Sequence, residues 1–162
     1  GWQFMASYSA TKKNIVPANE NANFDPNAEI NATNRTWEYI GRISGAYFFP
    51  YGVVGSVNFE NISGDRLAPQ GLFTGGRTIT SIVLNTAPIG TIKLPDTRHV
   101  DLRVEKAFTV FRGRKISARF NLYNALNANT IQAETVRLGS NYLRPTSILA
   151  PRIGEVSLSY TF

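Results

Sequence analysis

Strict alternation of apolar and polar residues over the last eleven positions constrains the fold of this chain more than any other feature. Between Arg152 and Phe162, apolar residues ending in two aromatics occupy every second position, and small polar or acidic residues occupy most of the others. A period of two places successive side chains on opposite faces of a β-strand. The pattern is typical of a lipid-facing strand in an outer-membrane barrel, and a half-buried strand of a soluble sheet gives the same alternation.

The rest of the chain repeats this period. Five further segments alternate in the same way: residues 2–11, 37–49, 53–60, 99–108 and 116–123. In each segment one face is largely apolar and the other carries polar or charged residues. The sequence therefore predicts an all-β fold, an antiparallel up-and-down arrangement of about six strands.

The connections between these segments alternate between long and tight. Long polar stretches follow the first, third and fifth segments, whereas tight turns are predicted at Pro50-Tyr51-Gly52 and around residues 111–114. Bacterial outer-membrane barrels combine long extracellular loops with short periplasmic turns. Soluble meanders more often have short connections at both ends. The order predicts a transmembrane β-barrel segment with Phe162 at the periplasmic rim. Within the second long connection, the β-branched residues of Thr78–Leu84 predict a small extra strand that projects above the barrel.

The aromatic residues agree with this topology. One group falls at the predicted periplasmic end and comprises Trp2, Phe4, Tyr47, Phe49, Phe108, Tyr160 and Phe162. A second group falls toward the outer end and comprises Tyr8, Trp37, Tyr39 and Phe59. Two girdles of aromatic residues are typical of a barrel in a membrane.

Composition excludes several classes of protein. The 17 Lys and Arg outnumber the 11 Asp and Glu but are scattered along the chain, so nucleic-acid binding is not expected. The absence of cysteine excludes disulfide scaffolds and thiolate metal sites. No apolar run reaches the 18 residues of a transmembrane helix. Because the chain starts at Gly1 without an initiator Met, and because six strands are fewer than the usual minimum of eight, we expect a fragment of a larger barrel.

Four sequence stretches resemble a known family. They are Leu94-Pro95-Asp96, VDLRV at 100–104, FNLYNALN at 120–127, and PTSILAPR at 145–152 followed by the terminal Phe162. They resemble the C-terminal end of TonB-dependent outer-membrane receptors, especially the Oar-like type with an N-terminal carboxypeptidase-regulatory-like domain. The resemblance is good over residues 94–162 and looser before them.

The resemblance implies a 22-stranded barrel in the outer membrane of a Gram-negative bacterium, with a plug inside it. It implies TonB-dependent uptake of a bulky solute, with periplasmic TonB contacting an N-terminal part that this sequence lacks. The expected partners are therefore membrane lipid, the rest of the barrel and its plug, TonB, and the barrel-insertion machinery. Two alternatives remain open: an outer-membrane barrel without a plug that has a structural or adhesive role, and a soluble β-barrel that binds an apolar ligand.

Catalytic chemistry is not indicated. His99 is the only histidine, and near Asp96 and Asp101 it is expected to be a solvated residue because metal sites need more ligands. Asp101 and Glu105 would lie roughly 13 Å apart on one strand, too far for a cooperating acid and base. We expect no enzyme activity, cofactor or metal.

The polar faces carry the candidate functional residues. Those expected to face the barrel lumen are Arg42, Glu60, Arg103, Glu105, Arg119 and Asn121. We favour the interpretation that these residues form cross-strand ion pairs and contact the plug. The alternative is that some of them line the path of the solute.

Two features of the apolar faces are also distinctive. Lys106 lies on an apolar face, where its stem can follow lipid and carry the charge to the headgroups. Tyr160 and Phe162 end the last strand, and we expect them to act as a signal for the insertion machinery, because an unpaired amphipathic strand can add to the edge of another sheet.

Overall fold

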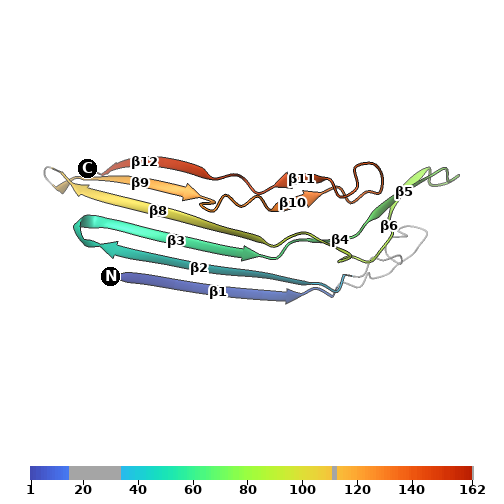
Figure 1. Cartoon of the computed structure of the whole chain (residues 1–162), viewed down its shortest axis with the longest axis horizontal. Helices are drawn as coiled ribbons and strands as arrows, with labels where there is room; N and C mark the ends of the chain where they lie inside the picture. The colour runs from blue at the N-terminus through green and yellow to red at the C-terminus, as the bar shows by residue number, and fades with distance from the viewer. Residues whose placement is uncertain (15–33, 111–112, 162) are drawn as a thin grey trace.

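The fold is a single antiparallel sheet of six long strands with short hairpins at one end. The computed structural model describes residues 1–14, 34–110 and 113–161. The strands lie side by side in chain order (Figure 1): β1 (Trp2–Lys12), β2 (Trp37–Phe49), β3 (Val53–Ile62), β8 (Thr97–Thr109), β9 (Lys115–Tyr123) and β12 (Ile153–Thr161). This confirms the predicted all-β, antiparallel, up-and-down arrangement. The sheet is open, and within the described residues β1 and β12 each have a neighbouring strand on one side only.

The tight connections lie together at one end of the sheet, where β1 begins and β12 ends (Figure 1). The turn between β2 and β3 is a short helical turn, η1 (Pro50–Gly52), as the sequence predicts. Tyr51 (φ 64°) and Gly52 (φ 71°) both adopt the left-handed region, which favours glycine. The turn between β8 and β9 is closed by a hydrogen bond from the backbone N–H of Val110 to the carbonyl of Arg114 (2.8 Å).

The second and third long connections extend the sheet at its opposite end, and most of the first, residues 15–33, lies outside the described residues. The second connection forms two small hairpins, in which β4 (Arg66–Leu67) pairs with β7 (Ile92–Lys93) and β5 (Gln70–Thr74) pairs with β6 (Ser81–Asn85). The strand expected at Thr78–Leu84 is therefore present, but it begins and ends later in the chain. The third connection contains β10 (Ile131–Glu134) and β11 (Pro145–Ile148), which the sequence does not predict because register shifts interrupt their pairing.

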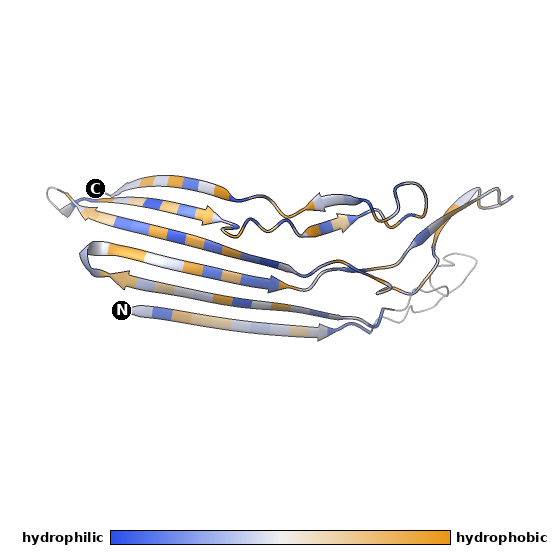
Figure 2. Ribbon diagram, in the orientation of Figure 1, coloured by the Kyte–Doolittle hydropathy of each residue, from blue (hydrophilic) through white to orange (hydrophobic). Residues whose placement is uncertain are grey.

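The register aligns the apolar faces of all six strands. One cross-strand row consists of Phe4, Gly45, Val57, Leu102, Leu122 and Gly154, all on one face. The adjacent row, on the opposite face, consists of Gln3, Ala46, Ser56, Arg103, Asn121 and Glu155. Figure 2 shows the resulting alternation of hydrophilic and hydrophobic residues along the strands. The sheet thus has one apolar face and one polar face.

The apolar face is not covered by the described part of the chain. Its side chains are exposed both on edge strands, as with Trp2 and Val156 (75% each), and on the central strand β8, as with Leu102 (42%). The buried apolar residues of the described chain are Ala68 and Leu94, and both lie in the second connection. In the described residues, no helix has the length and apolar character needed to cross a membrane.

Candidate functional site

The structure places all six candidate polar-face residues on the same face of the sheet. Arg42 on β2 is opposite Glu60 on β3, Glu105 on β8 is opposite Arg119 on β9, and Arg103 is opposite Asn121. Directly opposed residues of an antiparallel pair have neighbouring Cβ atoms, so their side chains interact. The period of two in each segment is sufficient to bring these residues together once the register is set.

Glu105 holds two arginines together near the turn end of the polar face. Its Oε2 atom accepts hydrogen bonds from Arg103 Nη2 and Arg119 Nε, both at 2.8 Å. Charge-assisted bonds of this kind are shorter and stronger than neutral ones. The cluster fixes the orientation of both guanidinium groups and joins β8 to β9.

A second charged cluster lies toward the opposite end. Arg42 Nε contacts Glu60 Oε1 at 2.5 Å, and His99 Nε2 lies 3.6 Å from Glu60 Oε2 and 3.9 Å from Asp101 Oδ2. The expectation that His99 is solvated is wrong, because its side chain is only 19% exposed between these two carboxylates. Within the described residues, no set of three or more His, Cys, Asp or Glu side chains is arranged to hold a metal ion.

Asp101 links the polar face to the base of the third connection. Its Oδ1 atom accepts a hydrogen bond from the backbone N–H of Asn124 at 2.9 Å. The Asn124 amide donates to the carbonyls of Ala128 (2.8 Å) and Ala150 (2.7 Å), and its Oδ1 accepts from the Ala128 N–H (2.8 Å). Asn124 is 5% exposed and has φ 48°, a conformation that asparagine tolerates better than most residues. The sequence does not predict these hydrogen bonds of Asn124, and their one visible signal is an asparagine at the end of a strand.

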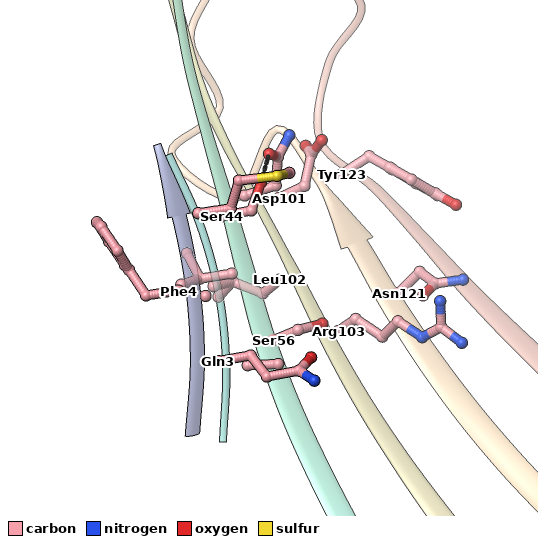
Figure 3. Close-up of a pocket in the computed structure, with 14 residues that line it drawn as sticks. Gln3, Phe4, Ser44, Ser56, Asp101, Leu102, Arg103, Asn121 and Tyr123 are labelled. Carbon is pink, nitrogen blue, oxygen red and sulfur yellow. Dashed lines mark hydrogen bonds between the residues drawn. The ribbon is translucent and has the colours of Figure 1, made fainter. Parts of the chain in front are cut away.

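The polar face also contains a hollow of about 770 Å³ that extends from β1 to β9. Gln3, Ser56, Asn58, Asp101, Arg103 and Asn121 are among the residues that line it. In Figure 3, Arg103 and Asn121 point to one side of the sheet and Phe4 points to the other. Many of its polar groups already have partners within the sheet: Arg103 bonds to Glu105, Ser44 Oγ donates to Asn58 Oδ1 (2.8 Å), and the Asn121 amide donates to Glu155 Oε2 (3.5 Å).

Asp96 marks the far border of the sheet, outside the six long strands. Its Oδ2 accepts a hydrogen bond from the hydroxyl of Tyr39 (2.7 Å), and its Oδ1 accepts from the backbone N–H of Gly64 (3.2 Å). The Tyr39 hydrogen bond is the main reason that the pKa of Asp96 lies below its usual value, and the Gly64 N–H and the charges of Lys93 and Arg98 act in the same direction. This carboxylate therefore ties the second connection to β2.

The two distinctive features of the apolar face lie at its turn end. Lys106 directs its ammonium to the tight turn, where Nζ donates to the carbonyl of Tyr51 at 2.6 Å. Tyr160 lies on the apolar face opposite Ile116. Phe162 lies outside the described residues.

The two faces differ in what they can bind. The polar face offers paired charges and a hollow with hydrogen-bonding groups, whereas the apolar face offers side chains that interact favourably with hydrocarbon. Such a sheet can separate an aqueous space from an apolar one. No family model matches the chain, and neither a curated protein nor a solved structure matches it.

Proposed function

We propose that the chain is the C-terminal part of the wall of a TonB-dependent outer-membrane receptor that takes up a bulky solute. The observation that carries this proposal is the apolar face, which is continuous over six strands and uncovered by the described residues. Soluble monomers rarely expose a contiguous apolar patch larger than a few hundred Å². In a membrane such a face lies against hydrocarbon, and the polar face lies toward the lumen.

The length of the apolar band supports a membrane position. On β8 the band lies between Arg98 and Lys106, which occupy the same face as Val100, Leu102 and Val104. Eight residues span roughly 27 Å along a strand, or about 20 Å across a membrane at the usual tilt of such strands. This is close to the roughly 25 Å apolar band of outer-membrane barrels, with a cation at each border.

The glycines of the apolar face fit a lipid-facing surface as well. An aromatic ring from the same sheet lies over three of them: Tyr8 over Gly41, Phe49 over Gly55 and Phe120 over Gly154, with ring atoms 3.5, 3.2 and 3.5 Å from the position of a Cβ. A sheet packed on a second layer needs projecting side chains to fill the space between the layers. Rings that lie along their own sheet instead give a smooth surface, which suits fluid lipid chains.

The open edges support a larger barrel. In lipid, unpaired backbone N–H and C=O groups are costly, so β1 and β12 require neighbouring strands from the rest of the protein. The resemblance to TonB-dependent receptors supports 22 strands, a plug, a periplasmic TonB partner, and recognition of Tyr160 and Phe162 by the insertion machinery. The residues proposed to face the lumen are Arg42, Glu60, Arg103, Glu105, Arg119 and Asn121.

A barrel without a plug is the second candidate, since one specific observation favours it. The charged groups of the Arg103–Glu105–Arg119 cluster bond to one another within the wall, so the cluster does not depend on a plug for its partners. A soluble barrel that holds an apolar ligand has less support, because the larger hollow lies on the polar face.

The gene upstream of Gly1 tests the choice between these candidates. We expect it to encode a signal peptide, a plug domain and the earlier barrel strands. The full-length protein should then fractionate with the outer membrane and require detergent for extraction. Upstream barrel strands without a plug would favour the second candidate, and a start codon close to Gly1 would exclude the receptor.

A further inference from the structure

A groove of about 520 Å³ lies in the apolar face near its turn end. Its lining includes Trp2, Phe4, Gly45, Tyr47, Gly55 and Val104. Gly45 forms an open part of the floor, because a Cβ at this position would meet Val57 Cγ1 and the carbonyl oxygen of Gln3 only at 3.8 Å. Most of the lining is apolar, and the groove follows two neighbouring cross-strand rows.

Lys106 lies beside the turn end of this groove, and the other nearby cation, Arg103, is paired with Glu105 on the polar face. Lys106 is two residues beyond Val104 on the same face of β8, roughly 7 Å along the strand. The hydrogen bond to the Tyr51 carbonyl holds its ammonium in place, 5.5 Å from the centre of the Phe108 ring. Both contacts are to uncharged groups.

The charge of Lys106 is therefore not neutralised. Among the described residues, Arg42, Arg103 and Arg119 on the polar face form ion pairs with carboxylates, and Lys106 forms none. A cation at the edge of an apolar surface is only partly hydrated, so its attraction for an anion is stronger than in bulk water. An ammonium has three N–H donors, and the bond to Tyr51 uses one of them.

We propose that a phospholipid binds here, with its phosphate at Lys106 and an acyl chain in the groove over Gly45. This inference rests on the proposed function, in which the apolar face meets lipid and the turn end lies at the periplasmic leaflet. The pairing of one cation with one apolar groove matches a molecule that has an anionic head and an apolar chain. A second copy of this chain is a poorer occupant, because its own apolar face would bring another Lys106 and no compensating anion.

Lipid binding to the full-length protein in a neutral detergent tests this site. Native mass spectrometry with a titration of phosphatidylglycerol should show a retained lipid, whereas a diacylglycerol with the same chains and no phosphate should bind at least about fivefold more weakly. Lys106→Met removes the charge, and Gly45→Leu fills the groove without a close contact to the backbone. We expect each variant to weaken phosphatidylglycerol binding about tenfold, while Ala10→Leu, elsewhere on the apolar face, leaves it unchanged.

The proposal would be overturned by equal binding of phosphatidylglycerol to the wild-type protein and to Lys106→Met, or by equal binding of the two lipids. Heat-dependent mobility on gels confirms that each variant is folded before it is compared. Quenching of a label at Leu102 by brominated zwitterionic lipid tests the membrane position of the apolar face separately from the phospholipid site. Quenching without any effect of Lys106→Met removes the lipid site alone, and absence of quenching removes the membrane assignment too.

Discussion

The two faces of the sheet use polar interactions in opposite ways. On the polar face, side-chain bonds occur along much of the strand length, from Arg42 with Glu60 to Arg119 with Glu105. On the apolar face, the polar side-chain bonds found among the described residues lie at the ends: Tyr39 with Asp96 and Arg98 with Asn61 at the far end, and Lys106 with the Tyr51 carbonyl at the turn end. This is the contrast expected under the proposed function, in which the middle of each face meets a different solvent.

The same contrast explains how a sheet without a covering layer can be stable. An ion pair between exposed groups in water contributes little to the free energy of folding. The ion pairs of the polar face therefore orient side chains more than they stabilise the sheet. Burial of the apolar face therefore has to supply most of the stabilisation, and in the described chain no second layer provides it. Lipid contact would provide it in the membrane.

Loss of the terminal ring should have the largest effect in cells. We predict that Phe162→Ala in the full-length protein sharply reduces insertion into the outer membrane, because the insertion machinery would recognise the terminal strand by its last aromatic residue. Refolding into detergent should remain nearly normal, since one ring is worth at most roughly 1.5 to 3 kcal/mol when fully buried. Insertion equal to wild type would limit Phe162 to a place in the aromatic girdle.

A charge introduced in the middle of the apolar face should destabilise the protein, whereas a charge introduced on the polar face should not. Leu102→Arg is expected to lower the free energy of unfolding by about 2 to 4 kcal/mol, because the guanidinium would lie near the bilayer midplane. Met5→Arg is the matched control, as it replaces an exposed apolar residue on the polar face. Urea unfolding in lipid vesicles measures both variants, and equal losses would mean that the two faces do not meet different solvents.

Removal of the shared carboxylate should have a smaller effect. Glu105→Ala leaves Arg103 and Arg119 as neighbouring like charges, and we expect a loss of about 1 to 2 kcal/mol after allowance for their exposure to water. Glu105→Gln retains an acceptor oxygen and should lose less. The same urea unfolding assay measures both variants. An unchanged free energy of unfolding in Glu105→Ala would contradict a stabilising role for the Arg103–Glu105–Arg119 cluster.

The smallest effect concerns the border of the apolar face. Because the Tyr39 hydroxyl lowers the pKa of Asp96, the ionised carboxylate stabilises the folded state fully above the usual value of 3.8, and this stabilisation is lost as the pH falls through the lowered pKa. Hydrogen exchange of residues 63–95 should therefore increase in this acidic range. Asp96→Asn should remove that pH dependence. If hydrogen exchange of the variant increased at acidic pH as in the wild type, another titratable group would be responsible.

The sequence predicted what depends on local periodicity and missed what depends on distant partners. The period of two was enough to place Leu102 and Arg103 on opposite faces, and Pro50-Tyr51-Gly52 was enough to locate a turn. The hairpin of β10 and β11 was missed because its irregular register leaves no clean alternation. The Lys106 bond to Tyr51 and the position of His99 beside Glu60 join residues that are far apart in the chain, so only the strand register reveals them.

The most direct test of the central proposal is the environment of alternate residues in the full-length protein in lipid vesicles. Spin labels would be placed singly at apolar-face positions Leu102, Phe120 and Leu158 and at polar-face positions Arg103, Arg119 and Ser157. We predict that the first set is accessible to oxygen dissolved in hydrocarbon and the second set to a water-soluble relaxation agent. Equal accessibility of the two sets, or the reverse order, would contradict a sheet that faces lipid on one side and water on the other.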